Sequence, residues 1–200
     1  MKPSERNPET LLSPEQWSIL QSAVLEVEGL IGEVVEVGVF RGGSAKLLCD
    51  SFPDQNVICI DTFEGLPGSL VAGIDGHSAG SFSCSLKEVA AFLPSNAKLV
   101  KMLYQPPDND PLEGKSLKLL HIDVDLYESV KRAIEANWPR IVPGGLIVCD
   151  DYNDAACRGA QKAVNDFCIS NGIALHTFKI SPQCIIKKPL QVSDRDSQAS

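Results

Sequence analysis

The feature that most limits the possible folds is an alternation of short apolar runs with stretches of helical periodicity. Continuous apolar runs are typical of strands buried on both faces of a parallel sheet. The helices between them supply the crossovers that parallel strands need. The seven runs are residues 33–38, 57–61, 98–103, 117–124, 145–149, 173–179 and 184–188. The sequence therefore predicts an α/β fold with a doubly wound, mostly parallel, seven-stranded sheet.

The last two predicted strands are connected differently from the others. Only about four residues, around the segment SPQC, separate them. Such a connection is far shorter than the roughly dozen residues of a parallel crossover. We therefore expect the last strand to run antiparallel to its neighbour.

Capping residues predict where three of the helices begin. The segment Ser13–Gln16 (SPEQ) has the pattern of a capping box with proline at the first helical position. Ser85–Glu88 (SLKE) repeats the capping box before a second helix. Asp125, followed by Glu128, is interpreted as the N-cap of a third helix.

Length and charge exclude several classes of protein. The 200 residues carry 26 acidic and 18 basic side chains, a net charge of −8, which opposes binding to nucleic acid or to an anionic membrane. No apolar run approaches the roughly 20 residues of a membrane span. The polar beginning, MKPSERNPET, does not have the pattern of a signal peptide. Residues 11–188 are expected to form a single domain, with flexible ends at 1–10 and 189–200.

The seven cysteines are scattered along the chain, and no CxxC or CxxH pair occurs among them. This spacing suits neither a zinc site nor a disulfide framework. Several of the cysteines lie inside apolar runs, where cysteine behaves as a small hydrophobic residue. The pattern predicts reduced, structural thiols in a cytoplasmic protein.

A glycine-rich turn follows the first predicted strand. The segment Glu36–Ser44 (EVGVFRGGS) has Phe40 where a dinucleotide fingerprint needs its middle glycine. Glycines allow a ligand to approach the backbone, and a helix start offers N–H donors to a carboxylate. Asp61, at the end of the second strand, is placed to accept the two hydroxyls of a ribose. The alternatives are a turn that serves packing alone and a solvated or capping Asp61.

Aspartates follow the fourth and fifth predicted strands. Asp123 ends one strand, and Asp150 and Asp151 end the next. Because carboxylates packed together repel one another, a shared cation is the natural partner. Oxygen ligands favour Mg²⁺, or else Mn²⁺ or Ca²⁺, over zinc. The alternative is a group of solvated acids; Asp125 is left out of the metal site because a helix cap explains it.

A long connection, residues 64–84, contains five glycines and no periodicity. Loops of this length in a compact domain are often functional lids. Its single histidine, His77, is a candidate general base or substrate contact, with a solvated side chain as the alternative. His121, inside an apolar strand, is predicted to be a satisfied core residue, and His176 to lie on a closing strand.

Together these segments resemble the class I S-adenosylmethionine-dependent methyltransferases, which have a Rossmann-like fold. The resemblance is greatest to the macrocin O-methyltransferase family, metal-dependent enzymes that methylate sugar hydroxyls of antibiotics. The matching stretches, in family order from about residue 33 to 168, are VVEVGVFRGGSA, DTFEGLP, HIDVDLYES, GGLIVCDDY and GAQKAVNDF.

The resemblance implies a set of site residues. Contacts to the methionine part of S-adenosylmethionine are implied around Glu36, Gly38, Gly42 and Ser44, with Asp61 on the ribose. A metal ion, Mg²⁺ or another hard divalent cation, is implied at Asp123, Asp150 and Asp151.

The chain departs from its relatives at two positions. Val124 replaces the glycine of the family's usual DGDLY, and Leu126 lies where catechol methyltransferases have a catalytic lysine. A lysine base at that position is thereby excluded. The predicted proton acceptor is Asp123, as a carboxylate beside the metal, or His77 from the lid. The expected partner is a small-molecule hydroxyl acceptor, with a homo-oligomer possible. The alternatives are methylation of a catechol or another diol, and a non-catalytic S-adenosylmethionine-binding module.

Overall fold

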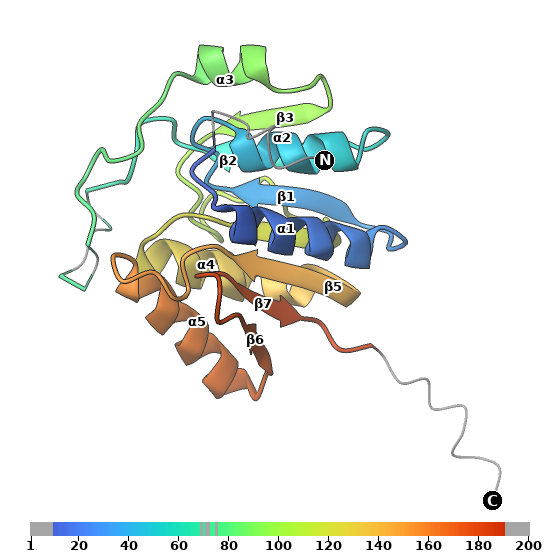
Figure 1. Cartoon of the computed structure of the whole chain (residues 1–200), viewed down its shortest axis with the longest axis vertical. Coiled ribbons are helices and arrows are strands. Elements are labelled where there is room, and N and C mark those ends of the chain that lie inside the picture. The colour runs from blue at the N-terminus through green and yellow to red at the C-terminus, as the bar shows by residue number, and fades with distance from the viewer. Residues whose placement is uncertain (1–9, 69, 71–72, 75, 191–200) are drawn as a thin grey trace, which may run out of the picture.

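The computed structural model describes residues 10–68, 70, 73–74 and 76–190. A seven-stranded sheet runs through them in the order β3-β2-β1-β4-β5-β7-β6 (Figure 1). The first five strands pair in parallel, whereas β7 is antiparallel to both β5 and β6. The predicted doubly wound fold and the antiparallel last strand are confirmed. The strands are β1 (Glu33–Val37), β2 (Val57–Asp61), β3 (Ala97–Lys101), β4 (Leu117–Ile122), β5 (Ile141–Cys149), β6 (Leu175–Thr177) and β7 (Cys184–Lys187).

Strand β5 begins four residues earlier than the sequence pattern indicated. The predicted strand began at Gly145, whereas β5 also includes Pro143 and Gly144, and its pairing with β4 has a register shift there. Gly144 has φ +82°, a left-handed conformation that glycine adopts without steric strain.

Helices cover both faces of the sheet, as a parallel sheet requires. Successive residues of β1 enter different cores: Val34 packs in the core with α1 and α2, and Val35 and Val37 in the core with α4 and α5. This alternation follows from the two-residue period of a strand. The helices are α1 (Pro14–Val27), α2 (Gly43–Ser51), α3 (Leu86–Phe92), α4 (Tyr127–Asn137) and α5 (Arg158–Asn171), with the 3₁₀ turn η1 (Trp138–Arg140) after α4.

Two of the three predicted helix caps are present. The Ser13 side chain accepts from the backbone of Gln16, whose side chain in turn accepts from the Ser13 backbone, so α1 begins with a complete capping box. Ser85 accepts from the backbone N–H of Glu88 at the start of α3.

The third predicted cap is wrong. Helix α4 has Leu126 as its N-cap, with no side-chain cap bond, and Asp125 lies one residue before it. Asp125 adopts a left-handed backbone conformation, φ +56°, and its carboxylate accepts a hydrogen bond from the Cys157 thiol. The cap rule assumes that the N-cap residue has an extended backbone. Asp125 does not, so the rule placed the start of the helix one residue too early.

Other expectations concern the ends and the cysteines. Six of the seven cysteines are buried, Cys84 being the exception, in keeping with their predicted place in the core. The ends predicted to be flexible lie almost entirely outside the described residues, and the domain limits stay predictions. Within the described parts of the chain, every helix is too short or too polar to cross a membrane.

Candidate active site

The carboxyl ends of β1, β2, β4 and β5 surround a pocket of about 310 Å³. This volume lies at the lower end of the roughly 300–1,000 Å³ typical of small-molecule sites. Most of the predicted site residues line it, whereas Glu36 and Gly42 do not. The predicted residues on its wall are Gly38, Ser44, Asp61, His77, Asp123, Asp150 and Asp151.

The turn after β1 is shaped by the approach of neighbouring chain segments. A Cβ atom on Gly38 would lie 1.7 Å from the backbone oxygen of Asp123, so only glycine lets the ends of β1 and β4 come this close. Phe40 takes a left-handed conformation, φ +48°, at the place of the missing fingerprint glycine. The glycine at position 38 is thus required by the close packing of the turn, whether or not a ligand also approaches the backbone there.

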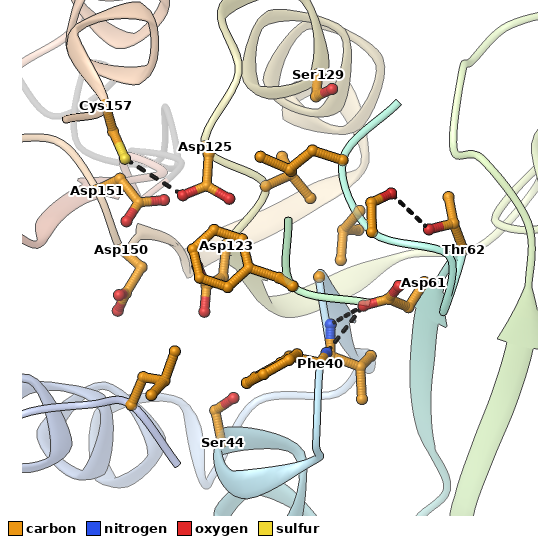
Figure 2. Close-up of a pocket in the computed structure, with 18 of the residues that line it drawn as sticks. Phe40, Ser44, Asp61, Thr62, Asp123, Asp125, Ser129, Asp150, Asp151 and Cys157 are labelled. Carbon is orange, nitrogen blue, oxygen red and sulfur yellow. Dashed lines mark hydrogen bonds between the residues drawn. The ribbon is translucent and has the colours of Figure 1, made fainter. Parts of the chain in front are cut away.

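Asp61 links two turns at the pocket wall (Figure 2). Its Oδ2 accepts from the backbone N–H groups of Val39 (2.7 Å) and Phe40 (2.9 Å), and its Oδ1 from that of Phe63 (2.6 Å). Since a carboxylate has about four lone-pair positions, one remains for a ligand. Asp61 therefore stabilises the turn after β1 in addition to any contact with a ribose.

Three carboxylates meet on the opposite side of the pocket (Figure 2). Oxygen atoms of Asp123, Asp150 and Asp151 all lie within 4.8 Å of one another, as the strand-end pattern predicted. Burial and the neighbouring carboxylate of Asp150 raise the pKa of Asp123 well above its usual range. Burial and the charge of Asp123 do the same to the pKa of Asp151. An oxygen-only cluster of this kind suits a hard divalent cation.

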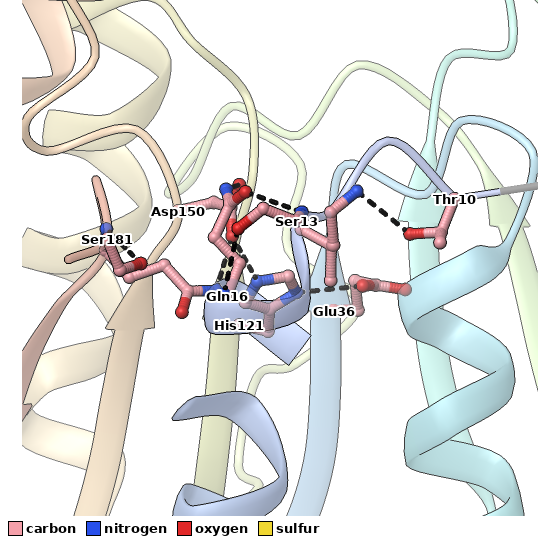
Figure 3. A network of polar contacts seen from close by, with 9 residues as sticks. Thr10, Ser13, Gln16, Glu36, His121, Asp150 and Ser181 are labelled. Carbon is pink, nitrogen blue, oxygen red and sulfur yellow. Dashed lines mark hydrogen bonds and ion pairs between the residues drawn. The ribbon is translucent and has the colours of Figure 1, made fainter. Parts of the chain in front are cut away.

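Asp150 is held by side chains that the sequence pattern did not reveal (Figure 3). The side-chain amide of Gln16, on α1, donates to its Oδ2 (2.7 Å), and that of Gln183, beside β7, donates to its Oδ1 (2.6 Å). Each glutamine is remote from Asp150 in sequence, so only the tertiary structure brings them together. Both amides fix the orientation of the carboxylate within the cluster.

His121 lies between the acid of the glycine turn and this cluster. Its Nδ1 is 2.8 Å from Glu36 Oε1, and its Nε2 is 3.6 Å from Asp150 Oδ1 (Figure 3). Burial alone would lower the pKa of His121, but the carboxylates of Asp150 and Glu36 raise it well above its usual range. The predicted core position is confirmed, but the prediction that the side chain is satisfied is only half right. Among the described residues Nδ1 has Glu36 as its partner, whereas Nε2 has no hydrogen-bond partner.

A second group of side chains gathers around Asp125. The Cys157 thiol donates to Asp125 Oδ1 (3.2 Å), and His77 Nε2 lies 3.6 Å from the same oxygen. The His77 ring also contacts the edge of Phe82, 5.1 Å away between centroids. Burial raises the pKa of Asp125. No local sequence signal marked this position, since Asp125 leaves the extended conformation and its partners Cys157 and His77 are remote in the sequence.

The fold and the pocket together define a class. A sheet with strand order 3-2-1-4-5-7-6, an antiparallel seventh strand and a site at the carboxyl ends of its parallel strands is that of the class I methyltransferases. The sequence model of the family described as Macrocin-O-methyltransferase (TylF) matches residues 10–188. The chain belongs to this family, and the predicted resemblance is confirmed.

Individual relatives agree with this assignment. The chain is 33% identical to the 8-demethyl-8-(2,3-dimethoxy-alpha-L-rhamnosyl)-tetracenomycin-C 4'-O-methyltransferase of Streptomyces olivaceus, over 76% of this chain and 65% of that protein. It is 25% identical to the mycinamicin III 3''-O-methyltransferase of Micromonospora griseorubida, over 87% and 76% of the two chains. The solved O-methyltransferase NovP has the same fold, with a TM-score of 0.76, 23% identity and coverage of 92% of this chain and 83% of NovP. The chain thus spans slightly less than two thirds of the length of the Streptomyces olivaceus relative.

Proposed function

We propose that the protein transfers a methyl group from S-adenosylmethionine to a hydroxyl on a sugar of a small natural product. The observation that carries the proposal is a pocket with a turn-and-helix binding wall on one side and the carboxylates of Asp123, Asp150 and Asp151 on the other. The name of one relative supports the sugar, since it is a 4'-O-methyltransferase of a rhamnosyl-tetracenomycin, and another relative is named a mycinamicin III 3''-O-methyltransferase. A non-catalytic binding module would have no need for a carboxylate cluster beside its ligand.

The wall formed by β1, α2 and β2 is assigned to the methyl donor. Gly38, Ser44 and Asp61 line the pocket there. The first turn of α2 offers backbone donors to the carboxylate of the methionine part. The remaining acceptor capacity of Asp61 suits a ribose hydroxyl, and the acidic surroundings suit a positively charged sulfonium. The sequence also placed Glu36 and Gly42 in the donor site; they stay in the proposal as residues that support this wall from behind.

Asp123, Asp150 and Asp151 are assigned to a divalent cation such as Mg²⁺. When bound, such an ion lowers the pKa of an acceptor hydroxyl and orients it for in-line displacement. The three carboxylates fit this role because their oxygens converge and their mutual repulsion opposes full ionisation without a cation. Gln16 and Gln183 hold Asp150 in the orientation that the cluster needs.

Proton acceptance is assigned to His77, with Asp125 as the carboxylate that stabilises the charged imidazole. His77 lines the pocket, and its Nε2 lies 3.6 Å from Asp125 Oδ1. The sequence analysis offered Asp123 as the other acceptor. Its position within the carboxylate cluster favours the cation as its partner instead.

The test is mass spectrometry of acceptors incubated with S-adenosylmethionine and Mg²⁺. The panel contains deoxysugar glycosides of natural products, the matching aglycones, and catechol. We expect methylation of at least one glycoside, loss of that activity in chelator, and no methylation of its aglycone. Methylation of catechol and aglycones but of no glycoside would contradict the proposed acceptor. Full turnover in chelator would contradict the cation.

A further inference from the structure

A second hollow lies on the surface beside the pocket. The turn after β5 and the connection between β6 and β7 form its walls, and both carry apolar side chains: Ala155, Phe178, Ile180 and Pro182. Asp154 and Pro182 line the pocket as well as this hollow, so the two spaces adjoin. The second hollow is called the hairpin groove below.

Hydrogen bonds hold the walls of the hairpin groove to each other and to the carboxylate cluster. The backbone N–H of Asn153 donates to the carbonyl of Pro182 (2.8 Å), which joins the turn after β5 to the β6–β7 connection. The next residue, Gln183, donates through its side-chain amide to Asp150 (2.6 Å). The groove therefore has a fixed position relative to the site assigned to the cation and the reacting hydroxyl.

The pocket alone is small for two substrates. Its volume of about 310 Å³ is at the lower end of the roughly 300–1,000 Å³ found for sites of a single drug-sized ligand. S-adenosylmethionine is itself a ligand of that size, so it leaves room for little more than a reacting sugar. A larger group attached to this sugar would have to extend out of the pocket, and the hairpin groove adjoins the end that holds the carboxylate cluster.

The charges around the two spaces distinguish between kinds of attached group. Among the described residues that line the pocket there is no lysine or arginine, whereas six aspartates line it: Asp61, Asp123, Asp125, Asp150, Asp151 and Asp154. A divalent cation would offset only two unit charges. In the hairpin groove, Lys179 and Asp154 have opposite charges. A nucleoside diphosphate, as in an activated sugar, would add negative charge here, and such a group is usually bound by arginine or lysine.

Ile180 is exposed where an apolar group could cover it. Its side chain is 74% exposed, and Phe178, two residues earlier, is half-buried. A single exposed apolar residue is ordinary on a protein surface, but Ile180 shares one groove with three other apolar side chains. Contact with an uncharged apolar molecule would remove this surface from water.

We propose that the hairpin groove binds the uncharged, apolar aglycone of a glycoside acceptor while the sugar of that glycoside occupies the pocket. This inference rests on the proposed methyl transfer to a sugar hydroxyl. Because the aglycone contributes to binding only when it is already attached to the sugar, the reaction that supplies the acceptor is a glycosyl transfer. Ile180 and its apolar neighbours would then determine which glycosides are accepted.

Steady-state kinetics with three forms of one deoxysugar test the proposal. The forms are its glycoside with an apolar aglycone, its methyl glycoside and its nucleoside diphosphate ester, each with saturating S-adenosylmethionine and Mg²⁺. We expect the highest kcat/KM of wild type with the apolar glycoside, since only this form fits both spaces. Ile180→Asn should raise KM for that glycoside by about 10-fold with little change in kcat, because the contact is the same in the substrate and transition-state complexes. Its KM for the methyl glycoside should equal that of wild type.

Matched variants separate the groove from a general effect on the fold. Ile180→Leu keeps an apolar side chain and should retain the wild-type KM. Ile169→Asn makes the same change at an isoleucine of α5 that is 81% exposed and does not line the groove, so it should leave KM unchanged. A wild-type KM in Ile180→Asn, or a higher kcat/KM for the nucleoside diphosphate ester than for the glycoside, would overturn this inference and leave methyl transfer in place. Absence of turnover with all three forms would instead contradict the proposed function, and this inference with it.

Discussion

Asp123→Asn should change the stability of the protein in opposite directions with and without a divalent cation. The substitution keeps the shape of the side chain and removes one of three carboxylates whose oxygens lie within 4.8 Å of one another. Without a cation, it relieves repulsion and should stabilise the fold. With saturating Mg²⁺, it removes a ligand and should reduce the stabilisation that the cation gives.

The expected magnitude follows from these distances. Two unit charges 4.8 Å apart interact by about 3.5 kcal/mol at an effective dielectric constant of about 20. Since 4.8 Å is the largest of these separations, an ionised Asp123 facing two ionised carboxylates would be destabilised by about 7 kcal/mol or more. Protonation limits this cost, because neutralising a carboxyl of unfolded pKa about 3.9 requires only about 4 kcal/mol at pH 7. We expect Asp123→Asn to raise the free energy of unfolding by about 2–4 kcal/mol in chelator at pH 7.

The effect should depend on pH in a defined direction. Burial and Asp150 raise the pKa of Asp123 in the folded state. A raised carboxyl pKa favours folding below the unfolded value and loses this contribution as pH rises through the folded value. Wild type and Asp123→Asn should therefore converge below pH of about 4, where the carboxyl is neutral in both states, and differ most near neutrality.

Urea unfolding in EDTA and in Mg²⁺, at several pH values, measures both effects. Asp108→Asn is the matched control, since it removes an exposed carboxylate whose nearest cation, on Arg132, is 3.8 Å away. The control should change the free energy of unfolding by less than about 0.5 kcal/mol. If Asp123→Asn were less stable than wild type in EDTA at pH 7, the repulsion argument would be refuted.

Three further predictions concern the supports of the site. Gln183→Leu removes the buried amide that donates to Asp150 and should weaken Mg²⁺ binding by about 10–100-fold in calorimetry. The control is Gln161→Leu, whose half-buried amide donates to Asn153 instead, and equal affinities of Gln183→Leu and wild type would contradict the role of the amide. Asp61→Ala leaves three backbone N–H groups without their charged acceptor and should lower the free energy of urea unfolding by about 3 kcal/mol; a loss below about 1 kcal/mol would count against it. Hydrogen exchange in residues 76–84 should slow when donor and acceptor bind, as expected of a lid, and equal rates in free and bound protein would exclude closure.

Local sequence rules sufficed for much of the fold because local and tertiary preferences agree there. Ser13 caps α1 through contacts within its own turn, so its pattern is readable without any neighbour. Asp123 and Asp150 could be placed together because parallel topology brings the ends of β4 and β5 to one edge of the sheet. The contacts of Gln16 and Gln183 with Asp150 had no such signal, since a glutamine at either position is equally compatible with an exposed surface.

Asp125 shows why a correct local rule can fail beside a functional pocket. A helix cap contributes about 1 kcal/mol, a small term that tertiary contacts can outweigh. Asp125 has a left-handed backbone and does not cap the helix. Its buried carboxylate instead faces Cys157 and His77. Burial of a carboxylate without compensation would cost more than the cap contributes, so the arrangement requires partners such as the thiol, the imidazole or a cation. We therefore infer that Asp125 is positioned for its contacts in the pocket and not for capping α4.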